Sequence, residues 1–421
     1  MRSQAWRTRL QIPAIVLGRG VTALATLRSL GRAGIPAYCI SHVDDFAGYS
    51  RWARCLPNTL QDTSTVAELA AFLRGLPFER AVLMPCSDWW AQKVARLDPE
   101  LSERFFYVGS SGAVINCFCD KLECAALAEA HGIPHPKTFA VDSPGDVNAL
   151  PISRDTSYFI KARDSQAFTM LLGIKAAQVS TVEDARAVVE KAHAVGQQVL
   201  LQEYLPGPPT NHYFVDGYAD PAGNIHARFV RQRLRMHPWP FGNSTCTRSI
   251  EMTEVPDILE TVDRLVAASG IRGIFSVEVK RDTRDGIAKV LDVNLRPWWY
   301  VEFAAVCGVN VCEMAYRAAI GLPVKQVTSY KVGRTCVFPL YDFGACLRLI
   351  GTGEMTPLDW ASSWLFSKHT ILSFHDPLPY VHCYSVMGLS YLGTRARRMP
   401  ERLRRRLLGE RLGPASVDHS T

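Results

Sequence analysis

The first part of the chain has short apolar runs that flank one helical pattern. Residues 13–17 and 81–86 are apolar segments that indicate buried strands. Between them, Leu24, Leu27 and Leu30 recur at the spacing of one helix face. Short buried strands that alternate with helices are typical of parallel sheets. The pattern therefore predicts a small, doubly wound α/β lobe.

From residue 120 the pattern changes to a mixture of helices and hairpin strands. A helix is expected from Asp120 to Gly132, and Thr181 and Asp184 resemble the start of another. Turn residues at 221–223 separate two alternating runs, which predicts a hairpin. Further strands are expected at 158–163, 198–207, 273–282 and 287–297, and a helix at about 255–270. This part is therefore expected to be α+β.

These changes divide the chain into three predicted parts, as its length of 421 residues leads one to expect. Residues 1–118 are the N-terminal α/β lobe, 119–325 a central domain, and 326–421 a C-terminal, helical and basic extension. Within the central domain we expect a small β-rich lobe at about 135–205 and a larger lobe at about 206–325.

The composition is that of a soluble globular protein, with 48% hydrophobic and 21% charged residues. Its 12 cysteines have no framework spacing. No apolar run reaches the roughly 18–20 residues that span a bilayer. We therefore expect a cytoplasmic protein with reduced thiols, with the periphery of a membrane as an open second location.

The formal charge of +7 is concentrated near the C-terminus. Residues 395–411 contain eight Arg and two Glu, and Leu403, Leu407 and Leu408 form a narrow apolar stripe. This is the pattern of a basic amphipathic helix, which would bind an anionic membrane surface or an acidic carrier. Nucleic acid is not expected, because no aromatic residues interleave with the arginines. A solvated helix without a partner stays open.

The clearest chemical feature is a group of oxygen-bearing side chains. Asp292 and Asn294 are two residues apart on one expected strand and share a face. A three-residue loop, Arg284 to Gly286, with Gly286 left-handed, would pair Glu278 with Asp292 and gather all three side chains. Carboxylate and amide oxygens suit Mg²⁺, with Mn²⁺ as a substitute. A solvated polar strand face is the alternative.

Cationic side chains would complete a phosphate site. Arg296 lies two residues beyond Asn294 on the same face, where a guanidinium would meet the charge of a transferring phosphoryl group. Lys161 lies inside an apolar strand and needs an anion or a route to solvent. Lys121 and Lys175 are further candidates, and the segment before Lys175 is expected to be a flexible cover. Each could also be an ordinary surface residue.

The order of these segments resembles the ATP-grasp superfamily. Within it, the chain resembles the predicted carboxylate–amine ligases that are like D-aspartate ligase and carbamoyl-phosphate synthase. The resemblance covers about residues 12–325, and FHDPLP at 374–379 resembles a late motif of this group. The segments that carry it are DK at 120–121, FIKAR at 159–163, GIKA at 173–176, LQEYLPG at 201–207, SVEVKRD at 276–282 and DVNLRP at 292–297.

The resemblance implies an ATP-grasp fold, and roles for most of these residues. Lys121, Lys161 and Lys175 would bind ATP phosphates, Glu278, Asp292 and Asn294 would hold Mg²⁺, and Arg296 would stabilise the transferred group. The adenine hinge would be formed by Gln202, Glu203, Tyr204 and Leu205. The implied reaction forms an amide or peptide bond between a small carboxylate and a small amine through an acyl phosphate, with release of ADP and phosphate. A homodimer is an open expectation.

The chain departs from the family at two positions. Asp292 stands where relatives usually carry Glu, so one metal would be held differently. After the hinge, where relatives usually have a carboxylate for the ribose, the nearest polar residue is the uncharged Asn211. Asn211 is therefore the expected but weaker ribose contact.

A second basic segment follows the hairpin turn. Arg231, Arg233 and Arg235 alternate along a strand and are expected to share a face, with Gly242 in a pliant turn nearby. In this family type the region borders the acceptor site, so Arg231, Arg233 and Gly242 are candidate substrate-binding residues. An exposed basic strand explains the same pattern.

Two other classes compete with a ligase. An ATP-binding regulator or pseudoenzyme would need only part of the residue set, and the missing ribose carboxylate favours it. A nicotinamide oxidoreductase would use the turn at Gly18 and Gly20, but the third glycine of that fingerprint is absent. The ligase uses the lysines, the oxygen cluster and Arg296 together.

Overall fold

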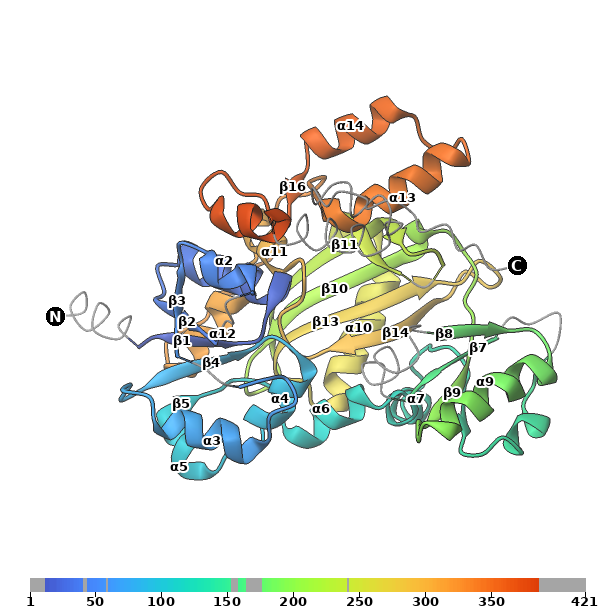
Figure 1. Cartoon of the computed structure of the whole chain (residues 1–421), viewed down its shortest axis with the longest axis horizontal. Helices are drawn as coiled ribbons and strands as arrows, with labels where there is room; N and C mark the ends of the chain where they lie inside the picture. The colour runs from blue at the N-terminus through green and yellow to red at the C-terminus, as the bar shows by residue number, and fades with distance from the viewer. Residues whose placement is uncertain are drawn as a thin grey trace, which may run out of the picture.

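The computed structural model describes residues 12–40, 44–57, 60–152, 158–163, 176–240 and 242–385. In this part of the chain the strands form three sheets. Figure 1 shows the N-terminal sheet at lower left, a long sheet through the centre and a small sheet at right. The basic segment 395–411 and Lys175 lie outside the described residues, so what was expected of them stays a prediction. No described helix combines the length and apolarity needed to cross a membrane.

The N-terminal lobe contains a parallel sheet of the predicted kind, in the order β3-β2-β1-β4-β5. Its strands are β1 (Ala14–Leu17), β2 (Ala37–Cys39), β3 (Ala53–Cys55), β4 (Ala81–Pro85) and β5 (Phe105–Phe106). Its helices are α2 (Gly20–Arg32), α3 (Val66–Arg74), α4 (Asp88–Val94), α5 (Pro99–Arg104) and the short η1 (Phe46–Tyr49). Two further helices, α6 (Gly112–Cys119) and α7 (Lys121–Ala130), lead into the next sheet.

The turn at Gly18 and Gly20 is held by protein groups. A side chain at Gly18 would come within 2.7 Å of Cys86 Cβ, because β1 and β4 end close together. The backbone N–H of Gly20, at the start of α2, donates to the Asp45 carboxylate over 3.0 Å. Gly18 therefore allows the ends of β1 and β4 to approach closely, and Gly20 begins a helix whose first N–H is bound by Asp45.

The small sheet is antiparallel, in the order β6-β9-β7-β8. Its strands are β6 (Thr138–Val141), β7 (Tyr158–Ala162), β8 (Ala176–Val179) and β9 (Val199–Glu203). The predicted helix is α9 (Val182–Ala194), and the Thr181 hydroxyl caps it by accepting from the Asp184 N–H over 3.1 Å. A short helix, η2 (Asp146–Ala149), precedes β7.

The central sheet has the order β14-β13-β10-β11-β12-β15-β16. Its strands are β10 (His212–Ala219), β11 (Ile225–His237), β12 (Asn243–Ser249), β13 (Gly273–Arg281), β14 (Ala288–Asn294), β15 (Thr335–Val337) and β16 (Lys368–His369). The associated helices are α10 (Pro256–Ser269), α11 (Val301–Cys307), α12 (Val311–Ala319), α13 (Pro339–Gly351), α14 (Pro357–Leu365), η3 (Pro209–Asn211) and η4 (Met252–Glu254). The predicted mixture of α/β and α+β architecture is confirmed.

The β13–β14 hairpin reaches the predicted pairing by a different route. Glu278 does lie opposite Asp292, and Gly286 is left-handed with a φ of 73°. However, the Asp282 N–H bonds the Ile287 carbonyl, so the loop has four residues rather than three. That loop alone would place Glu278 opposite Leu291, on the wrong face. A register shift between Glu278 and Val279 adds one residue on β14 and restores the pairing.

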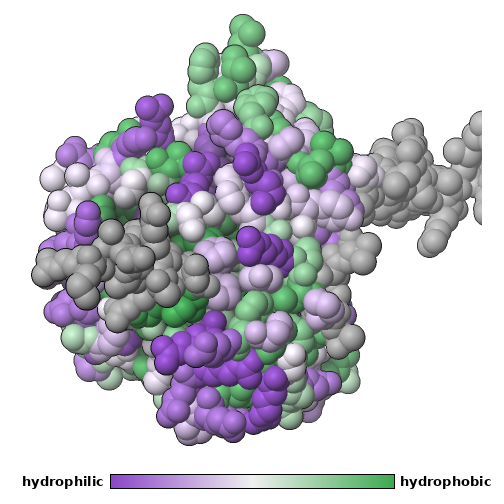
Figure 2. Space-filling view, turned by 90° about the vertical axis from the view of Figure 1, so that its left-hand side faces the viewer, coloured by the Kyte–Doolittle hydropathy of each residue, from purple (hydrophilic) through white to green (hydrophobic). Residues whose placement is uncertain are grey.

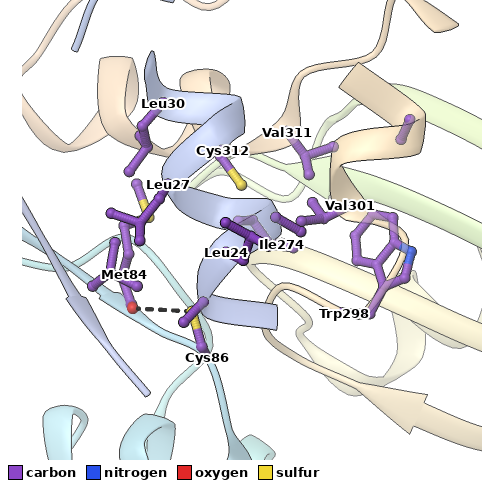
Figure 3. Close-up of a cluster of buried hydrophobic side chains, with 14 of the residues drawn as sticks. Leu24, Leu27, Leu30, Met84, Cys86, Ile274, Trp298, Val301, Val311 and Cys312 are labelled. Atoms are coloured by element: carbon purple, nitrogen blue, oxygen red, sulfur yellow. Dashed lines mark hydrogen bonds between the residues drawn. The ribbon is translucent and has the colours of Figure 1, made fainter. Parts of the chain in front are cut away.

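The N-terminal lobe and the central domain share one hydrophobic core. Figure 3 shows Leu24, Leu27 and Leu30 of α2 beside side chains of β4, α11 and α12. Met84 belongs to β4 and Cys86 directly follows this strand, and a hydrogen bond of 3.6 Å joins the Cys86 thiol to the Met84 carbonyl. The apolar stripe of α2 is therefore buried against α11 and α12, which follow β14 in sequence.

A buried ionic cluster fastens residues 368–376 to the same helix. Arg28, fully buried on α2, donates to the Asp376 carboxylate over 2.9 Å and to the Ile371 carbonyl over 2.8 Å. Asp376 belongs to the FHDPLP segment, and Glu302 accepts from Lys368 over 2.9 Å. Ion pairs in such surroundings depend on every partner, since a lone buried charge is costly.

We expect Arg28→Met to destabilise the protein strongly. The change leaves the buried Asp376 carboxylate without its cation, while Glu302 keeps Lys368. An unpaired buried charge typically costs about 3–5 kcal/mol. The midpoint of urea unfolding should fall accordingly. In the control Arg74→Met, which removes an exposed pair with Asp98, the loss should stay below about 1 kcal/mol. Equal midpoints for the two variants would contradict the account of the cluster.

Candidate active site

A cleft of about 1500 Å³ lies between the small sheet, the central sheet and the helices α4, α6 and α7. It brings together nearly all the residues that the sequence proposed. Asn211 is the described candidate that does not line it. Those that do are Lys121, Lys161, Gln202, Glu203, Tyr204, Leu205, Arg231, Arg233, Gly242, Glu278, Asp292, Asn294 and Arg296.

The oxygen cluster lies on β13 and β14 at the floor of this cleft. Glu278 and Asp292 are direct cross-strand partners, and Asn294 is two residues further along β14. Asn294 Nδ2 donates to Asp292 Oδ2 over 3.0 Å. The shared face that alternation predicted is therefore present, with both carboxylates and the amide together.

Each carboxylate has cationic or N–H partners from other elements. Glu278 Oε1 accepts from Arg233 over 2.9 Å and is 2.8 Å from His212 Nδ1. Burial alone would raise the pKa of Glu278, but Arg233 and His212 hold that pKa well below its usual value. Burial, reinforced by Arg233, lowers the pKa of His212 to about 4. Glu278 is therefore ionised at neutral pH, and His212 is neutral.

Two lysines approach the cluster from α7 and from the small sheet. Lys121, at the start of α7, forms an ion pair with Asp292. Burial opposes its charge, but Asp292 outweighs that and raises the pKa of Lys121. Lys161 on β7 donates to Gln202 Oε1 over 2.6 Å. Burial, with Lys121 nearby, lowers the pKa of Lys161 to about 8.

The end of β9 and the segment after it are held by the β13–β14 hairpin. Glu203 accepts from Arg284 over 2.6 Å and from the Lys137 N–H over 3.1 Å. Lys280, two residues beyond Glu278, donates to the Leu205 carbonyl over 2.6 Å. The predicted hinge is therefore tied to the strand that carries the oxygen cluster.

Asn211 has a structural partner instead of a place in the cleft. Its Nδ2 donates to the Arg281 carbonyl over 3.0 Å, next to the close turn at Gly207. The sequence placed it at the ribose because relatives carry a carboxylate nearby. The side chain is instead used to fasten η3 to β13.

Arg296 lies beside the oxygen cluster, as alternation along β14 predicted. Its Nη2 donates to Asn294 Oδ1 over 2.9 Å. It also makes two hydrogen bonds to Asp88 at the start of α4, of 3.0 and 2.9 Å. The guanidinium is thus held in one orientation by the N-terminal lobe.

Arg231, on β11, also lines the cleft. Its Nε donates to buried Asp216 over 2.7 Å, and its guanidinium lies 3.7 Å from the centre of the Phe214 ring. Asp216 also accepts from Ser276 over 2.6 Å. Arg231 Nη1 is buried and has no hydrogen-bond partner among the described residues. A fixed, partly unsatisfied guanidinium is suited to bind a carboxylate or phosphate.

The other two arginines of β11 have different environments. Arg233 donates to Glu278 and to Ser244, the latter over 2.8 Å. Arg235 does not line the cleft, because a register shift between Arg233 and Arg235 interrupts the pairing with β12. It makes two hydrogen bonds to Asp342 on α13, of 2.9 and 2.7 Å. All three arginines are buried, so the alternative of an exposed basic strand is wrong.

Gly242 lies where the chain folds tightly back on itself. A Cβ at this position would be 2.1 Å from the His237 carbonyl carbon. The absence of a side chain therefore lets residues 237 and 242 approach closely at the edge of the cleft. Met236, Pro240, Trp298, Trp299 and Tyr300 line the same end.

Several residues of the cleft had no recognisable sequence signal. Asp88 pairs with Arg296 across 208 positions of the chain, a separation that no local pattern predicts. Lys280 on β13 and His212 on β10 are cross-strand partners, and both line the cleft. For His212, the parity of β10 was an available signal, because Phe214, two residues on, pairs with Glu278.

The donor set fits a hard divalent cation that is shared with phosphates. Among the described residues, no three His, Cys, Asp or Glu side chains form a metal-binding group. Glu278, Asp292 and Asn294 offer two carboxylates and one amide, which would leave several positions of an octahedral ion to water and phosphate oxygens. Mg²⁺ usually binds at nucleotide sites in this way. Binding would require Asp292 and Glu278 to exchange part of their contact with Lys121 and Arg233.

Comparisons with known proteins agree with this arrangement. Residues 175–336 match the family model described as ATP-grasp in the biosynthetic pathway with Ter operon. Over 323 residues the chain is 22% identical to the D-aspartate ligase of Enterococcus faecium (strain Aus0004). The aligned part covers 71% of this chain and 74% of that protein.

Solved structures share the fold at low sequence identity. The L-amino acid ligase from Bacillus licheniformis is 15% identical, with a TM-score of 0.59 over 77% of this chain and 78% of that one. The biotin carboxylase–β,γ-ATP complex from Campylobacter jejuni is 16% identical, with a TM-score of 0.57 over 77% of this chain and 75% of that one.

The fold is that of these ATP-grasp structures, and residues 175–336 match an ATP-grasp family model. The sequence relative is a ligase, which agrees with the resemblance that the order of the segments indicated.

The pKa of Lys161 predicts how nucleotide affinity depends on pH. A triphosphate binds the ammonium form, so the affinity for MgATP should fall as pH rises above about 8, by at most about tenfold per pH unit for one linked proton. Lys161→Arg should flatten this decline, because a guanidinium stays protonated. Calorimetric titrations between pH 6.5 and 9.5 measure it.

Lys280 requires a parallel control, because burial, aided by Arg233, lowers its pKa to about 8 as well. Lys280→Arg should remove only its own part of the pH dependence. If Lys161→Arg has the same pH profile as the unmodified protein, Lys161 does not bind the phosphates.

Proposed function

We propose that this protein uses ATP to activate a small carboxylate and joins it to an amine. The observation that carries this proposal is the unsatisfied Nη1 of Arg231, in the same cleft as the oxygen cluster. Asp216 and Phe214 fix the buried Arg231 guanidinium in place, and its Nη1 group is left to bind a small anion. Its presence beside a phosphate site supports a carboxylate or its phosphorylated form as the ligand.

The nucleotide would be held by groups of both lobes. Lys121 and Lys161 would bind its phosphates, and the backbone of residues 203–205 would contact the adenine edge. Glu278, Asp292 and Asn294 would hold one or two Mg²⁺ ions. The metal supplies charge neutralisation of the phosphates and of the oxygen that leaves.

In the first step, a carboxylate oxygen of the substrate would attack the γ-phosphorus, and the bond between that phosphorus and the β–γ bridging oxygen would break. ADP leaves and an acyl phosphate remains. Arg296, oriented by Asp88, would stabilise charge on the transferred group.

In the second step, the nitrogen of the amine would attack the acyl carbon. The carbon–oxygen bond to phosphate breaks, phosphate leaves, and the nitrogen loses its proton to solvent or phosphate. Arg231 would hold the substrate anion in place during both steps, so that attack is intramolecular in effect.

The most direct test traps the activated carboxylate without knowledge of the amine. The protein is incubated with ATP, Mg²⁺, hydroxylamine and a panel of amino acids and organic acids. The proposal predicts a hydroxamate and equal amounts of ADP with at least one acid. ADP formation without hydroxamate for every acid that stimulates it would contradict an acyl phosphate.

Arg231→Lys should affect the carboxylate more than ATP. The lysine keeps a charge near Asp216 but cannot offer a forked pair of N–H donors. Loss of one charged hydrogen bond of roughly 1.5–3 kcal/mol predicts an increase in KM for the carboxylate of about 10–100-fold, with MgATP affinity unchanged. The matched control is Arg228→Lys, on the same strand but paired with Asp263. Unchanged KM in Arg231→Lys would remove Arg231 from the substrate site.

Asp292→Asn and Glu278→Gln should abolish most magnesium-dependent turnover while the protein stays folded. Both changes keep the side-chain shape but remove a charge that the ion requires. Turnover should fall by at least about 100-fold, as expected when charge stabilisation is lost in the transition state. Turnover measured against Mg²⁺ concentration, with Mn²⁺ as a second ion, checks this. Normal turnover in the folded double variant would contradict the metal assignment.

One observation favours a second candidate function, an ATP-binding regulator or pseudoenzyme. Asn211 Nδ2 donates to the Arg281 carbonyl, and the sequence from Pro208 to Asn211 contains no carboxylate. A regulator would bind MgATP yet form no ADP with any acid of the panel. The hydroxylamine experiment therefore separates the two functions.

A further inference from the structure

One end of the cleft is walled by apolar and aromatic side chains. Two segments of the chain supply it, through Met236, Pro240, Trp298, Trp299 and Tyr300. We call this wall the aromatic end. Trp298 is two residues beyond Arg296, so the rings border the place where Arg296 would meet the transferred phosphoryl group. The aromatic end is therefore next to the carboxylate that would receive this group.

The aromatic end also adjoins the guanidinium of Arg231, which lies 5.2 Å from the centre of the Tyr300 ring. The Tyr300 hydroxyl donates to the Ser244 carbonyl over 2.7 Å, and Ser244 pairs with Met236 on β11. Because its hydroxyl is already bonded, Tyr300 contributes an apolar ring beside the unsatisfied Nη1 of Arg231. An anion bound by Arg231 would thus have apolar surface next to it.

A β-bulge on β11 makes this end apolar. Simple alternation from Arg231 and Arg233 would bring Arg235 into the cleft. The first register shift adds one residue on β11, so Met236 lines the cleft while Arg235 bonds to Asp342. The fold therefore places a thioether side chain where alternation predicts a third cation. A thioether packs favourably against aromatic rings.

The two tryptophans of the aromatic end are fixed by other parts of the protein. Trp298 belongs to the core that the N-terminal lobe shares with the central domain, near Val301 (Figure 3). Its Nε1 is buried and has no hydrogen-bond partner among the described residues. The ring of Trp299 lies 5.4 Å from that of Phe338 and 5.9 Å from that of Tyr341. Rings that are already ordered lose little entropy when a ligand packs on them.

The charges of the cleft favour a substrate with a single carboxylate. Among the described lysines and arginines that line the cleft, only Arg231 has a buried nitrogen without a partner. The others already bond to a side chain or carbonyl of the protein. A second carboxylate, such as that of aspartate, would lie among apolar rings without a cation, which is costly.

We propose that the carboxylate substrate is an aromatic monocarboxylic acid, whose ring packs on Trp299 and Met236 while Arg231 binds its anionic group. This inference rests on the proposed function and names the substrate class of the same site. Aromatic pairs gain stability from stacked or edge-to-face contact beyond the gain from buried area. A ring is therefore favoured over an alkyl chain of similar size.

The adenine of ATP is the other flat group that the rings could receive. The predicted adenine contacts at residues 203–205 are bound by Lys280 and Arg284 of the β13–β14 hairpin. The aromatic end instead follows Arg296 in the chain and adjoins Arg231. This position favours the acid over the nucleotide base as the group that the rings bind.

The test compares acids in the hydroxylamine reaction at saturating MgATP. The acids are phenylacetate and both enantiomers of phenylalanine, aspartate and alanine. We expect the highest kcat/KM with an aromatic acid, by about tenfold or more. An equal or higher value with aspartate or alanine would overturn this inference alone. No hydroxamate with any acid would overturn the proposed function, and this inference with it.

Two variants test the assignment of the rings. Trp299→Ala should raise KM for the aromatic acid about tenfold or more, with little change for alanine. Met236→Lys should raise kcat/KM for aspartate about tenfold or more and lower it for the aromatic acid, because an ammonium would bind the second carboxylate. Opposite changes for two acids do not arise from a general loss of structure. Both variants should keep the MgATP affinity of the unmodified protein.

The matched control for the ring is Trp239→Ala. Trp239 is 44% exposed, lies 4.8 Å from the Arg348 guanidinium and does not line the cleft. A second control addresses adsorption to other apolar surfaces. The topmost part of the molecule, where Figure 1 places α14, is mostly apolar in Figure 2, and Leu365 on this helix is 77% exposed. Trp239→Ala and Leu365→Lys should both leave KM for the aromatic acid unchanged.

Two further results would overturn the proposal. The first is an equal increase in KM for Trp299→Ala and for the two controls, which would place the binding of the acid outside the aromatic end. The second is a loss of MgATP affinity in Trp299→Ala with an unchanged KM for the acid, which would assign the rings to the adenine.

Discussion

The repulsion between Glu278 and Asp292 is the constraint on which the rest of the cleft depends. Two carboxylates directly opposite each other on neighbouring strands are unfavourable unless cations lie nearby. In this structure Arg233 neutralises one and Lys121 the other, and these cations come from β11 and α7. A magnesium-bound triphosphate would take over this compensation, because its ions bind the carboxylates and its phosphates bind the released lysine. The pairing thus keeps the site assembled and charged before the nucleotide binds.

The same hairpin also connects the site to the rest of the molecule. Lys280 and Arg284 hold the segment after β9, so the strand that carries Glu278 also fixes the predicted adenine contacts. At its other end, β14 leads to Arg296, which Asp88 orients from the N-terminal lobe. Beyond it, α11 and α12 pack on α2. The N-terminal lobe, the small lobe and the larger lobe therefore meet around one pair of strands.

Local patterns in the sequence predicted much of this arrangement. The alternation of Asp292, Asn294 and Arg296 gave their common face, and the pattern around α2 and β4 gave the parallel lobe. The pairing of Glu278 was predicted correctly from a wrong loop length, because a bulge on β14 has no sequence signal as clear as a turn glycine. The partners of Arg296, Arg235 and Arg28 lie 208, 107 and 348 positions away. Such contacts depend on how the parts pack, which local periodicity does not encode.

The central claim is that the cleft phosphorylates a carboxylate held by Arg231. Its most direct measurement uses an acid from the active panel, labelled with ¹⁸O in the carboxyl group, in a reaction with ATP, Mg²⁺ and its amine. If an acyl phosphate forms, one labelled oxygen must move to the inorganic phosphate, because the carbon–oxygen bond to phosphate breaks in the second step. Mass spectrometry of the phosphate should therefore show one ¹⁸O for each amide formed. Amide formation with unlabelled phosphate would contradict the account.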